Sequence, residues 1–189
     1  MTMPRFLLCL LLWMSGASLL AQEAPDFTGA WVINDSLSDN TDKQVEAALR
    51  AAGVKIQRKL FDRRQDRYRG GPEDQELYDR ISYDKVLNIR LEDGTYDFTY
   101  ADDYVRPVYT DDRSRSISLN ALDSVQDFSF AHWEGEVLEV EARPRDGGFA
   151  NESYRLLNGG AQLEVRLYIR PRTFEAPIRI KRVYDRRPG

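Results

Sequence analysis

Apolar and polar residues alternate with a period of two along most of the chain from Val86 to the C-terminus. Such alternation is typical of β-strands that bury one face and leave the other in water. Short turns rich in Gly and Asp separate the alternating runs, as antiparallel neighbours require. The runs cover about nine segments: 86–91, 96–100, 104–110, 116–119, 125–133, 138–142, the strand that bears Tyr154 and Leu156, 163–169 and 178–184.

An earlier apolar run, Asp26–Asn34, contains a Gly-x-Trp sequence and predicts the first strand of the same sheet. No βαβ alternation is present, so we expect a mainly β, antiparallel up-and-down barrel of about 8–10 strands. Closing the barrel would leave no exposed edge strand. Pro107 lies inside one predicted strand, and a proline there indicates a sheet edge or a bulge.

A polar segment follows the first strand and leads into a helical pattern. Thr41 and Gln44 have the spacing of a capping box, and Gly53 is a natural helix stop. Between them, apolar residues recur at helical spacing and predict a helix over about 42–52: Val45, Ala48, Leu49 and Ala52. A second short helix is expected over Glu76–Tyr83, which gives one or two short helices after the first strand.

Lys55–Arg69 is the most charged segment, with seven cations against two aspartates. We interpret it as part of a charged helical or irregular insert at about 35–85, whose side chains pair with one another and with water. The alternative is a basic arm that contacts an envelope protein, an anionic polymer or a lipid surface.

The N-terminus has the features of a secretory signal peptide. Arg5 precedes a short apolar run, Phe6–Trp13, and small residues lead to Ala21. The run is shorter than the roughly 20 residues that a membrane-spanning helix needs. We therefore expect residues 1–21 to be removed, leaving one domain over 22–189 in the periplasm or outside the cell, without stable membrane insertion.

Removing this leader changes the composition slightly. It holds one of the 27 basic residues and no acidic one, so the net charge moves from −4 to −5. The single cysteine, Cys9, also lies in the leader. The mature domain must then be stabilised by its core without disulfides, and its acidic balance argues against a nucleic-acid or anionic-membrane binder.

The sequence lacks a recognisable catalytic or cofactor signature. His132 is the only histidine, so a site built from several histidines is excluded. No nucleophile elbow, P-loop or dinucleotide fingerprint is present. The pattern places His132 on one strand face with Phe128 and Phe130, which predicts a hydrogen-bonded core histidine. We predict no catalytic residue, no metal and no cofactor.

Three stretches together resemble an uncharacterised family of exported bacterial lipocalin-like (calycin-type) proteins. They are the start Phe27-Thr28-Gly29-Ala30-Trp31, the hairpin that contains Trp133-Glu134-Gly135 and Leu138-Glu139-Val140-Glu141, and Arg182-Val183-Tyr184-Asp185-Arg186 near the C-terminus. The likeness covers Asp26–Asn34 and Leu87–Arg186 but not the basic insert. In lipocalins a late arginine packs over the Gly-x-Trp indole, and the resemblance implies that Gly29, Trp31 and Arg182 close one end of the barrel. Arg186, on the same strand face, is the next choice.

Three functions fit these observations. The resemblance favours a non-enzymatic exported protein that binds a small hydrophobic or amphipathic ligand, because aromatic residues at alternating positions can line a cavity. The second is an envelope scaffold or interaction protein with a solid barrel. The third and most distant is a calycin-type hydrolase or isomerase. A ligand cavity would separate the first from the second.

Overall fold

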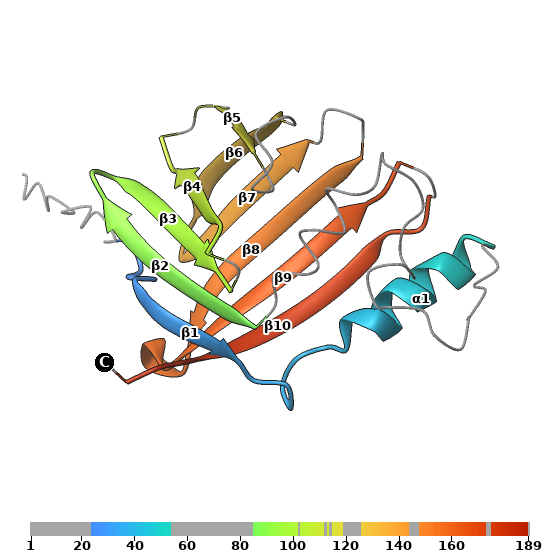
Figure 1. Cartoon of the computed structure of the whole chain (residues 1–189), viewed down its shortest axis with the longest axis horizontal. Coiled ribbons are helices and arrows are strands. Elements are labelled where there is room, and N and C mark those ends of the chain that lie inside the picture. Colours follow the sequence, from blue (N-terminus) through green and yellow to red (C-terminus); the bar gives the residue numbers. More distant parts are fainter. Residues whose placement is uncertain are drawn as a thin grey trace, which may run out of the picture.

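A computed structural model describes residues 24–53, 85–101, 103–111, 113, 115–118, 126–143, 148–172 and 175–188. The described part is mainly β, with one α-helix after the first strand (Figure 1). Its elements are β1 (Gly29–Ile33), α1 (Thr41–Ala51), β2 (Val86–Glu92), β3 (Thr95–Tyr100), β4 (Val105–Tyr109), β5 (Arg115–Ser118), β6 (Gln126–Glu134), β7 (Val137–Arg143), β8 (Phe149–Leu157), the 3₁₀ turn η2 (Asn158–Gly160), β9 (Gln162–Arg170) and β10 (Ile178–Arg186).

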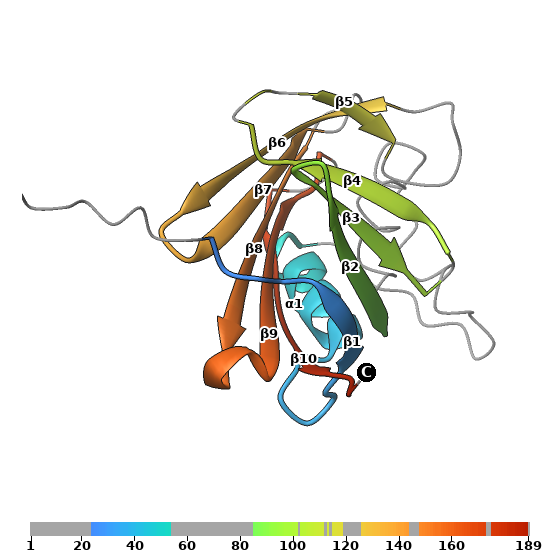
Figure 2. The ribbon, with the colours of Figure 1, turned by 90° about the vertical axis from the view of Figure 1, so that its left-hand side faces the viewer.

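The strands form one antiparallel sheet in the order β4-β3-β2-β1-β10-β9-β8-β7-β6-β5. Except for β4 and β5, each strand lies beside its neighbour in the chain, and β1 pairs with β10, the first strand with the last. The sheet curls into the barrel that Figure 2 shows from one end. This confirms the predicted up-and-down architecture.

Closure is less complete than the sequence led us to expect. The sheet order ends at β4 and β5, so the barrel has a seam between these two strands. Pro107 lies in β4, opposite Asp97 of β3. Because proline donates no backbone hydrogen bond, it is tolerated at this edge, and the predicted edge position is confirmed.

A tight turn sets the register of the β2–β3 hairpin. Asp93 and Gly94 both have positive φ, 48° and 78°, which is the requirement of a type I′ turn between antiparallel strands. The turn aligns Glu92 with Thr95 and keeps Leu91 on the same face as Tyr96. The predicted turn therefore determines which side chains of β2 and β3 face inward.

Helix α1 forms over almost the predicted range, but a different residue caps it. The Asn40 side chain, and not that of Thr41, accepts a hydrogen bond from the Lys43 amide at 3.0 Å. Thr41 is the first helical residue, so the expected capping box is wrong by one position. Asparagine at the N-cap satisfies an amide that the helix itself leaves unpaired.

The apolar face of α1 belongs to the main core. Val45 is fully buried and Leu49 is 8% exposed, and both join the hydrophobic cluster of the barrel. The helix packs next to β10 and lies at the end of the barrel opposite the viewer in Figure 2. It covers the part of β10 that extends beyond β1.

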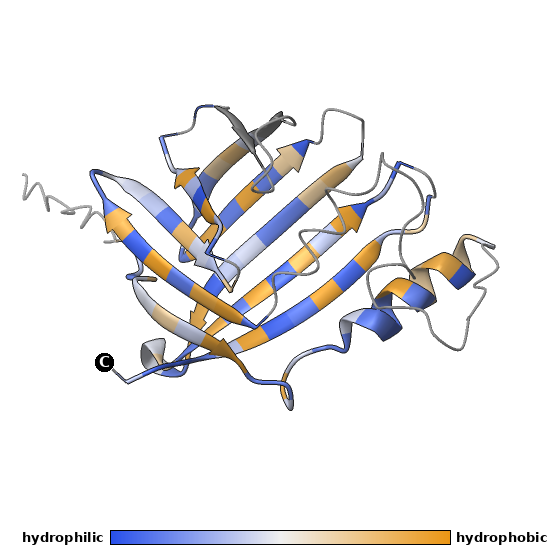
Figure 3. Cartoon of the chain, viewed as in Figure 1, coloured by the Kyte–Doolittle hydropathy of each residue, from blue (hydrophilic) through white to orange (hydrophobic). Residues whose placement is uncertain are grey.

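The core is built by alternate residues of nearly every strand, as the hydropathy bands of Figure 3 show. On β9 and β10 the inward set includes Leu163, Val165, Ile178 and Ile180, each at most 4% exposed. Their neighbours in sequence point outward and are mostly charged. The alternation that predicted these strands therefore also separates their core residues from their surface residues.

Several predictions fall outside the described residues. These are the signal peptide over 1–21, the basic segment Lys55–Arg69 and the second helix over Glu76–Tyr83. Within the described part of the chain, no helix has the length and apolar character needed to cross a membrane.

Candidate functional site

One end of the barrel is closed by aromatic side chains and an arginine. Phe27, just before β1, stacks on Trp133 of β6 with ring centroids 5.4 Å apart. Tyr96 of β3 contacts both rings, at 6.4 and 6.3 Å. Phe27 also accepts a hydrogen bond at its backbone carbonyl from Trp31 Nε1, at 3.0 Å. The segment before β1 therefore joins opposite walls of the barrel.

The cation over Trp31 is Arg186. Its guanidinium carbon lies 4.2 Å from the centre of the indole, and Arg186 is the direct cross-strand partner of Trp31. The guanidinium also donates to the backbone carbonyls of Thr28 and Gly160. It thus ties the chain before β1, the turn after β8 and the last strand together.

Gly29 makes this arrangement possible. Its φ of 132° is disfavoured for other residues, and an added Cβ would lie 2.8 Å from Arg186 Nη1. Glycine is therefore required both for the backbone conformation and for the space that the guanidinium occupies. The structure brings two of the three predicted residues, Gly29 and Trp31, together with Arg186.

Arg182 takes a different position from the one predicted. It is paired with Val165 of β9 and lies four residues before Arg186 on β10, about 13 Å along an extended strand. Its side chain is 2% exposed and faces the barrel interior. The choice of Arg182 as the partner of Trp31 is corrected to Arg186, because the register of β1 against β10 aligns Trp31 with the later arginine.

A second cluster of polar side chains crosses the middle of the barrel. Arg106 of β4 donates from Nη1 to both carboxylate oxygens of Glu152 on β8, at 3.0 and 3.1 Å. Both side chains are buried, at 1% and 5% exposure. The hydroxyl of Tyr154 donates to the same carboxylate. An ion pair with an additional hydrogen bond is the arrangement that makes buried charges tolerable.

The protonation states of this cluster follow from its surroundings. Burial alone would lower the pKa of Arg106, but Glu152 and Tyr100 raise it above its usual value. Burial and the Glu152 carboxylate raise the pKa of Tyr154 well above 10.0. Arg106 is therefore charged and Tyr154 is a neutral donor at physiological pH.

One edge of the Arg106 guanidinium is not bound by a carboxylate. Nε and Nη2 are buried and make no hydrogen bond of standard geometry within the described part of the chain, and besides Glu152 the Tyr100 side chain is a hydrogen-bonding neighbour of this guanidinium. These two nitrogens form one side of the planar guanidinium, the side that can hold a carboxylate or phosphate with two parallel hydrogen bonds. This edge has the chemistry of an anion-binding site inside the barrel.

Sequence reasoning missed both members of this ion pair. Arg106 shares strand parity with buried Val108, and Glu152 shares it with Ala150 and Tyr154. A charged residue at an inward position of an alternating strand indicates a buried polar site, and the sequence contains this signal at both positions. The pairing itself joins strands that are not neighbours in the sheet, and strand parity does not reveal such a contact.

His132 lies on the outer face of the barrel and not in its core. The inward residues of this part of β6 are Ser129, Ala131 and Trp133, so His132 points outward, where its ring lies 5.1 Å from that of Phe130. The predicted core histidine is wrong because the inward parity of β6 falls on the odd-numbered residues. Among the described residues, no group of three or more His, Cys, Asp or Glu could hold a metal ion.

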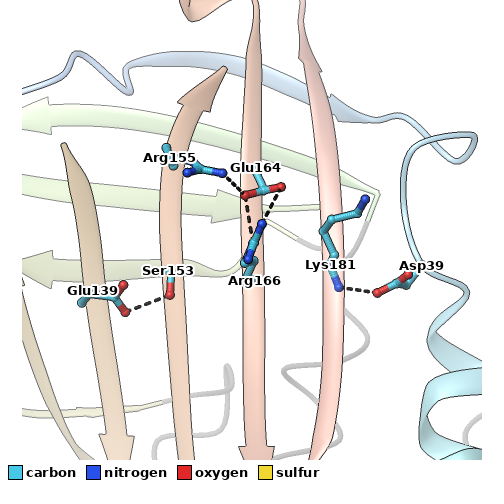
Figure 4. A network of polar contacts seen from close by, with 7 residues as sticks. All are labelled: Asp39, Glu139, Ser153, Arg155, Glu164, Arg166 and Lys181. Carbon is cyan, nitrogen blue, oxygen red and sulfur yellow. Dashed lines mark hydrogen bonds and ion pairs between the residues drawn. The ribbon is translucent and has the colours of Figure 1, made fainter. Parts of the chain in front are cut away.

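A network of ion pairs covers the outer face of β8 and β9 (Figure 4). Glu164 accepts from Arg155 at 2.8 Å and from Arg166 at 2.9 Å. Burial acts to raise the pKa of Glu164, but the two arginines outweigh it and hold this pKa below the usual 4.5. The carboxylate form is therefore favoured by folding.

This lowered pKa predicts a pH-dependent contribution to stability. A carboxyl group with a depressed folded-state pKa stabilises the fold above its ordinary pKa and loses that contribution as the pH falls through the folded-state value. We expect Glu164→Gln to lower the free energy of unfolding near pH 7 by less than about 1 kcal/mol, since both arginines are largely exposed. Urea denaturation should show the difference between the two proteins shrink as the pH falls below 4.5 and vanish once the pH is below the folded-state pKa of Glu164. A difference that persists at low pH would contradict this explanation.

No protein-family model matches the sequence, and no curated protein matches it either. Similar solved structures include secretory abundant heat soluble protein 4 from Ramazzottius varieornatus, with 16% identity over 85% of this chain and 94% of that one and a TM-score of 0.50. Apo lipid binding protein 8 from Caenorhabditis elegans has 13% identity over 85% and 95%, with a TM-score of 0.51. A point mutant of the fluorescent protein UnaG has 18% identity over 86% and 97%, with a TM-score of 0.50. At these identities the likeness shows the fold alone, an antiparallel up-and-down barrel of the lipocalin-like kind.

Proposed function

We propose that the barrel binds a small amphipathic molecule whose anionic headgroup contacts Arg106. The observation that carries this proposal is the buried Nε–Nη2 edge of that guanidinium. A buried donor without an acceptor costs about 1–3 kcal/mol, and more when the group is charged. A carboxylate or phosphate at this edge would remove that cost and supply the binding energy.

The calycin-type fold is consistent with this proposal but does not by itself establish a ligand. One of the similar structures is named a lipid binding protein, and a shared fold alone is an argument by analogy. The apolar cross-strand partners of the ion pair, Phe98, Val140 and Leu167, would contact the hydrocarbon part of the ligand. We propose a carrier or sensor without catalytic activity.

The test uses two fluorescent probes that differ only in their headgroups, dansylated undecanoic acid and dansylated undecanol. We expect the acid to bind and the alcohol to bind at least tenfold more weakly, a difference of about 1.4 kcal/mol. Replacing the ion pair by apolar residues, Arg106→Met with Glu152→Leu, should remove the preference for the acid. Equal binding of both probes to the unmodified protein would contradict the role of Arg106.

A second candidate is an envelope scaffold whose barrel binds nothing. The specific observation in its favour is the Arg106–Glu152 pair itself, because it crosses the interior and occupies its middle. In this case any partner would bind outside, and Lys55–Arg69 is the proposed contact. Native mass spectrometry of protein purified from its own cells separates the candidates: a co-purifying small molecule supports the carrier, and the bare mass of the chain supports the scaffold.

We also propose that the protein acts outside the cytoplasm. The support is the signal-peptide pattern of residues 1–21. Sequencing the N-terminus of the mature protein should give a start near Gln22. An intact Met1 in the membrane fraction would contradict cleavage and export.

A further inference from the structure

The outer face of the barrel has a hollow of about 530 Å³. It lies over β8, β9 and β10, on the opposite side of the sheet from Arg106 and Glu152. Its volume is in the range of small-molecule sites. Among the described residues, its polar lining includes Asp39, Asn151, Ser153, Arg166, Arg179 and Lys181.

Strand register arranges the outward side chains of this hollow in two rows. In one row, Asn151 of β8 is opposite Tyr168 of β9, which is opposite Arg179 of β10. In the other row, Ser153, Arg166 and Lys181 follow in the same way. Directly opposite side chains have Cβ atoms about 5 Å apart, so a single small molecule can reach both rows.

The second row places two cations directly opposite each other. Arg166 and Lys181 are cross-strand partners, and like charges in this position are destabilising. Glu164 compensates Arg166, to which it is bonded at 2.9 Å. Within the described part of the chain, no carboxylate pairs with the ammonium of Lys181, whose backbone amide donates to Asp39 at 2.7 Å. Figure 4 shows Arg166 and Lys181 on neighbouring strands.

Arg179 adds a third cation. It lies over the ring of Tyr168, with its guanidinium carbon 4.9 Å from the ring centre, and it makes no ion pair within the described residues. The stacking fixes the plane of the guanidinium and leaves its N–H groups available. Because Glu164 compensates Arg166, Arg179 and Lys181 against Asp39 leave the lining residues with an excess of one positive charge.

The side of the hollow next to β7 carries a carboxylate, that of Glu139. Asn151 and Ser153 both donate to the carboxylate of Glu139, each at 2.9 Å. This carboxylate is negative, so an anion would be repelled from the β7 side and attracted to the β10 side. The uneven charge favours a ligand with an anionic group at one end and neutral polar groups at the other.

We propose that this hollow binds the phosphate or carboxylate group of a small polar molecule, with Arg179 and Lys181 as the contacts to the anion. This site is separate from the interior site of the proposed function and does not depend on it. The same oxyanion could belong to a free metabolite or to a lipid headgroup. The experiment below distinguishes these two sources.

The test is a titration of the ¹⁵N-labelled full chain, followed by NMR, with inorganic phosphate, methyl phosphate and acetate, each compared with sodium chloride at equal ionic strength. We expect saturable shifts of the amides of 166–168 and 179–181 with at least one oxyanion. The double variant Arg179→Gln, Lys181→Gln should weaken this binding at least tenfold. Arg90→Gln, which removes an exposed strand arginine outside the hollow, is the matched control and should leave it unchanged.

Vesicles of phosphatidylcholine with and without phosphatidylglycerol test the lipid source. Co-sedimentation that needs phosphatidylglycerol and both cations would support a lipid headgroup, whereas binding of the soluble anions alone would support a free metabolite. The absence of saturable binding in every arm, or equal binding by the double variant, would overturn the proposal. Binding of the dansylated acid should stay unchanged in the double variant, so failure here is distinguishable from failure of the interior site.

Discussion

Replacing Trp31 by alanine is expected to lower the free energy of unfolding by roughly 3–5 kcal/mol. The side chain is fully buried, so truncation removes apolar contacts and leaves a cavity. It also removes the hydrogen bond to Phe27 and the surface on which Arg186 lies. Such a loss is a large part of the roughly 5–15 kcal/mol that stabilises an ordinary domain.

A double-mutant cycle assigns part of this loss to the contact between Trp31 and Arg186. Arg186→Ala alone should destabilise the protein less than Trp31→Ala, and its effect should shrink when Trp31 is already absent. Urea denaturation of the two single variants and the double variant measures the coupling. We expect it to exceed the roughly 0.3–0.5 kcal/mol within which independent effects add.

Arg182 provides the control for this cycle. It lies on the same strand face but four residues away from Arg186, so its effect should be additive with that of Trp31→Ala. If Trp31 were coupled to Arg182 and not to Arg186, the contact between Trp31 and Arg186 would be contradicted and the partner suggested by the sequence would be the right one. If Trp31→Ala does not fold, Trp31→Phe keeps an aromatic ring beneath Arg186 and allows the same comparison.

The second large effect is expected from Glu152→Ala. This change leaves Arg106 buried without its carboxylate, and breaking a buried ion pair in this way costs about 3–5 kcal/mol. Tyr154 loses the acceptor of its hydroxyl at the same time. Thermal and urea denaturation should both show the loss.

The matched comparison removes both charges together. The variant with Arg106→Met and Glu152→Leu should be within about 1–2 kcal/mol of the unmodified protein or more stable, because apolar residues of similar size often replace a buried pair without loss. The result bears on function: a stable double variant without preference for the anionic probe would show that the charges serve binding more than folding. A double variant as unstable as Glu152→Ala would show that the ion pair is required for the fold.

The strands, their turns and most of the inward residues were predictable from the sequence alone, whereas on β6 the predicted inward face, that of His132, is the outer one. Period-two alternation requires no knowledge of the partner strand, and glycine at positions such as Gly94 is needed for local backbone reasons. The helix after the first strand was predictable for the same reason, because Val45 and Leu49 recur at helical spacing. Its cap was misplaced by one residue, since Asn40 and Thr41 are both good capping residues.

Only the tertiary structure decided which distant residues meet. Arg182 and Arg186 have the same strand parity, so alternation cannot choose between them, whereas the register of β1 on β10 places Arg186 beside Trp31. In the same way, parity places Arg106 and Glu152 inside the barrel, but only the curvature of the sheet brings β4 across to β8. Local pattern determines which face a side chain takes, and register and curvature, which depend on the whole sheet, determine its partner.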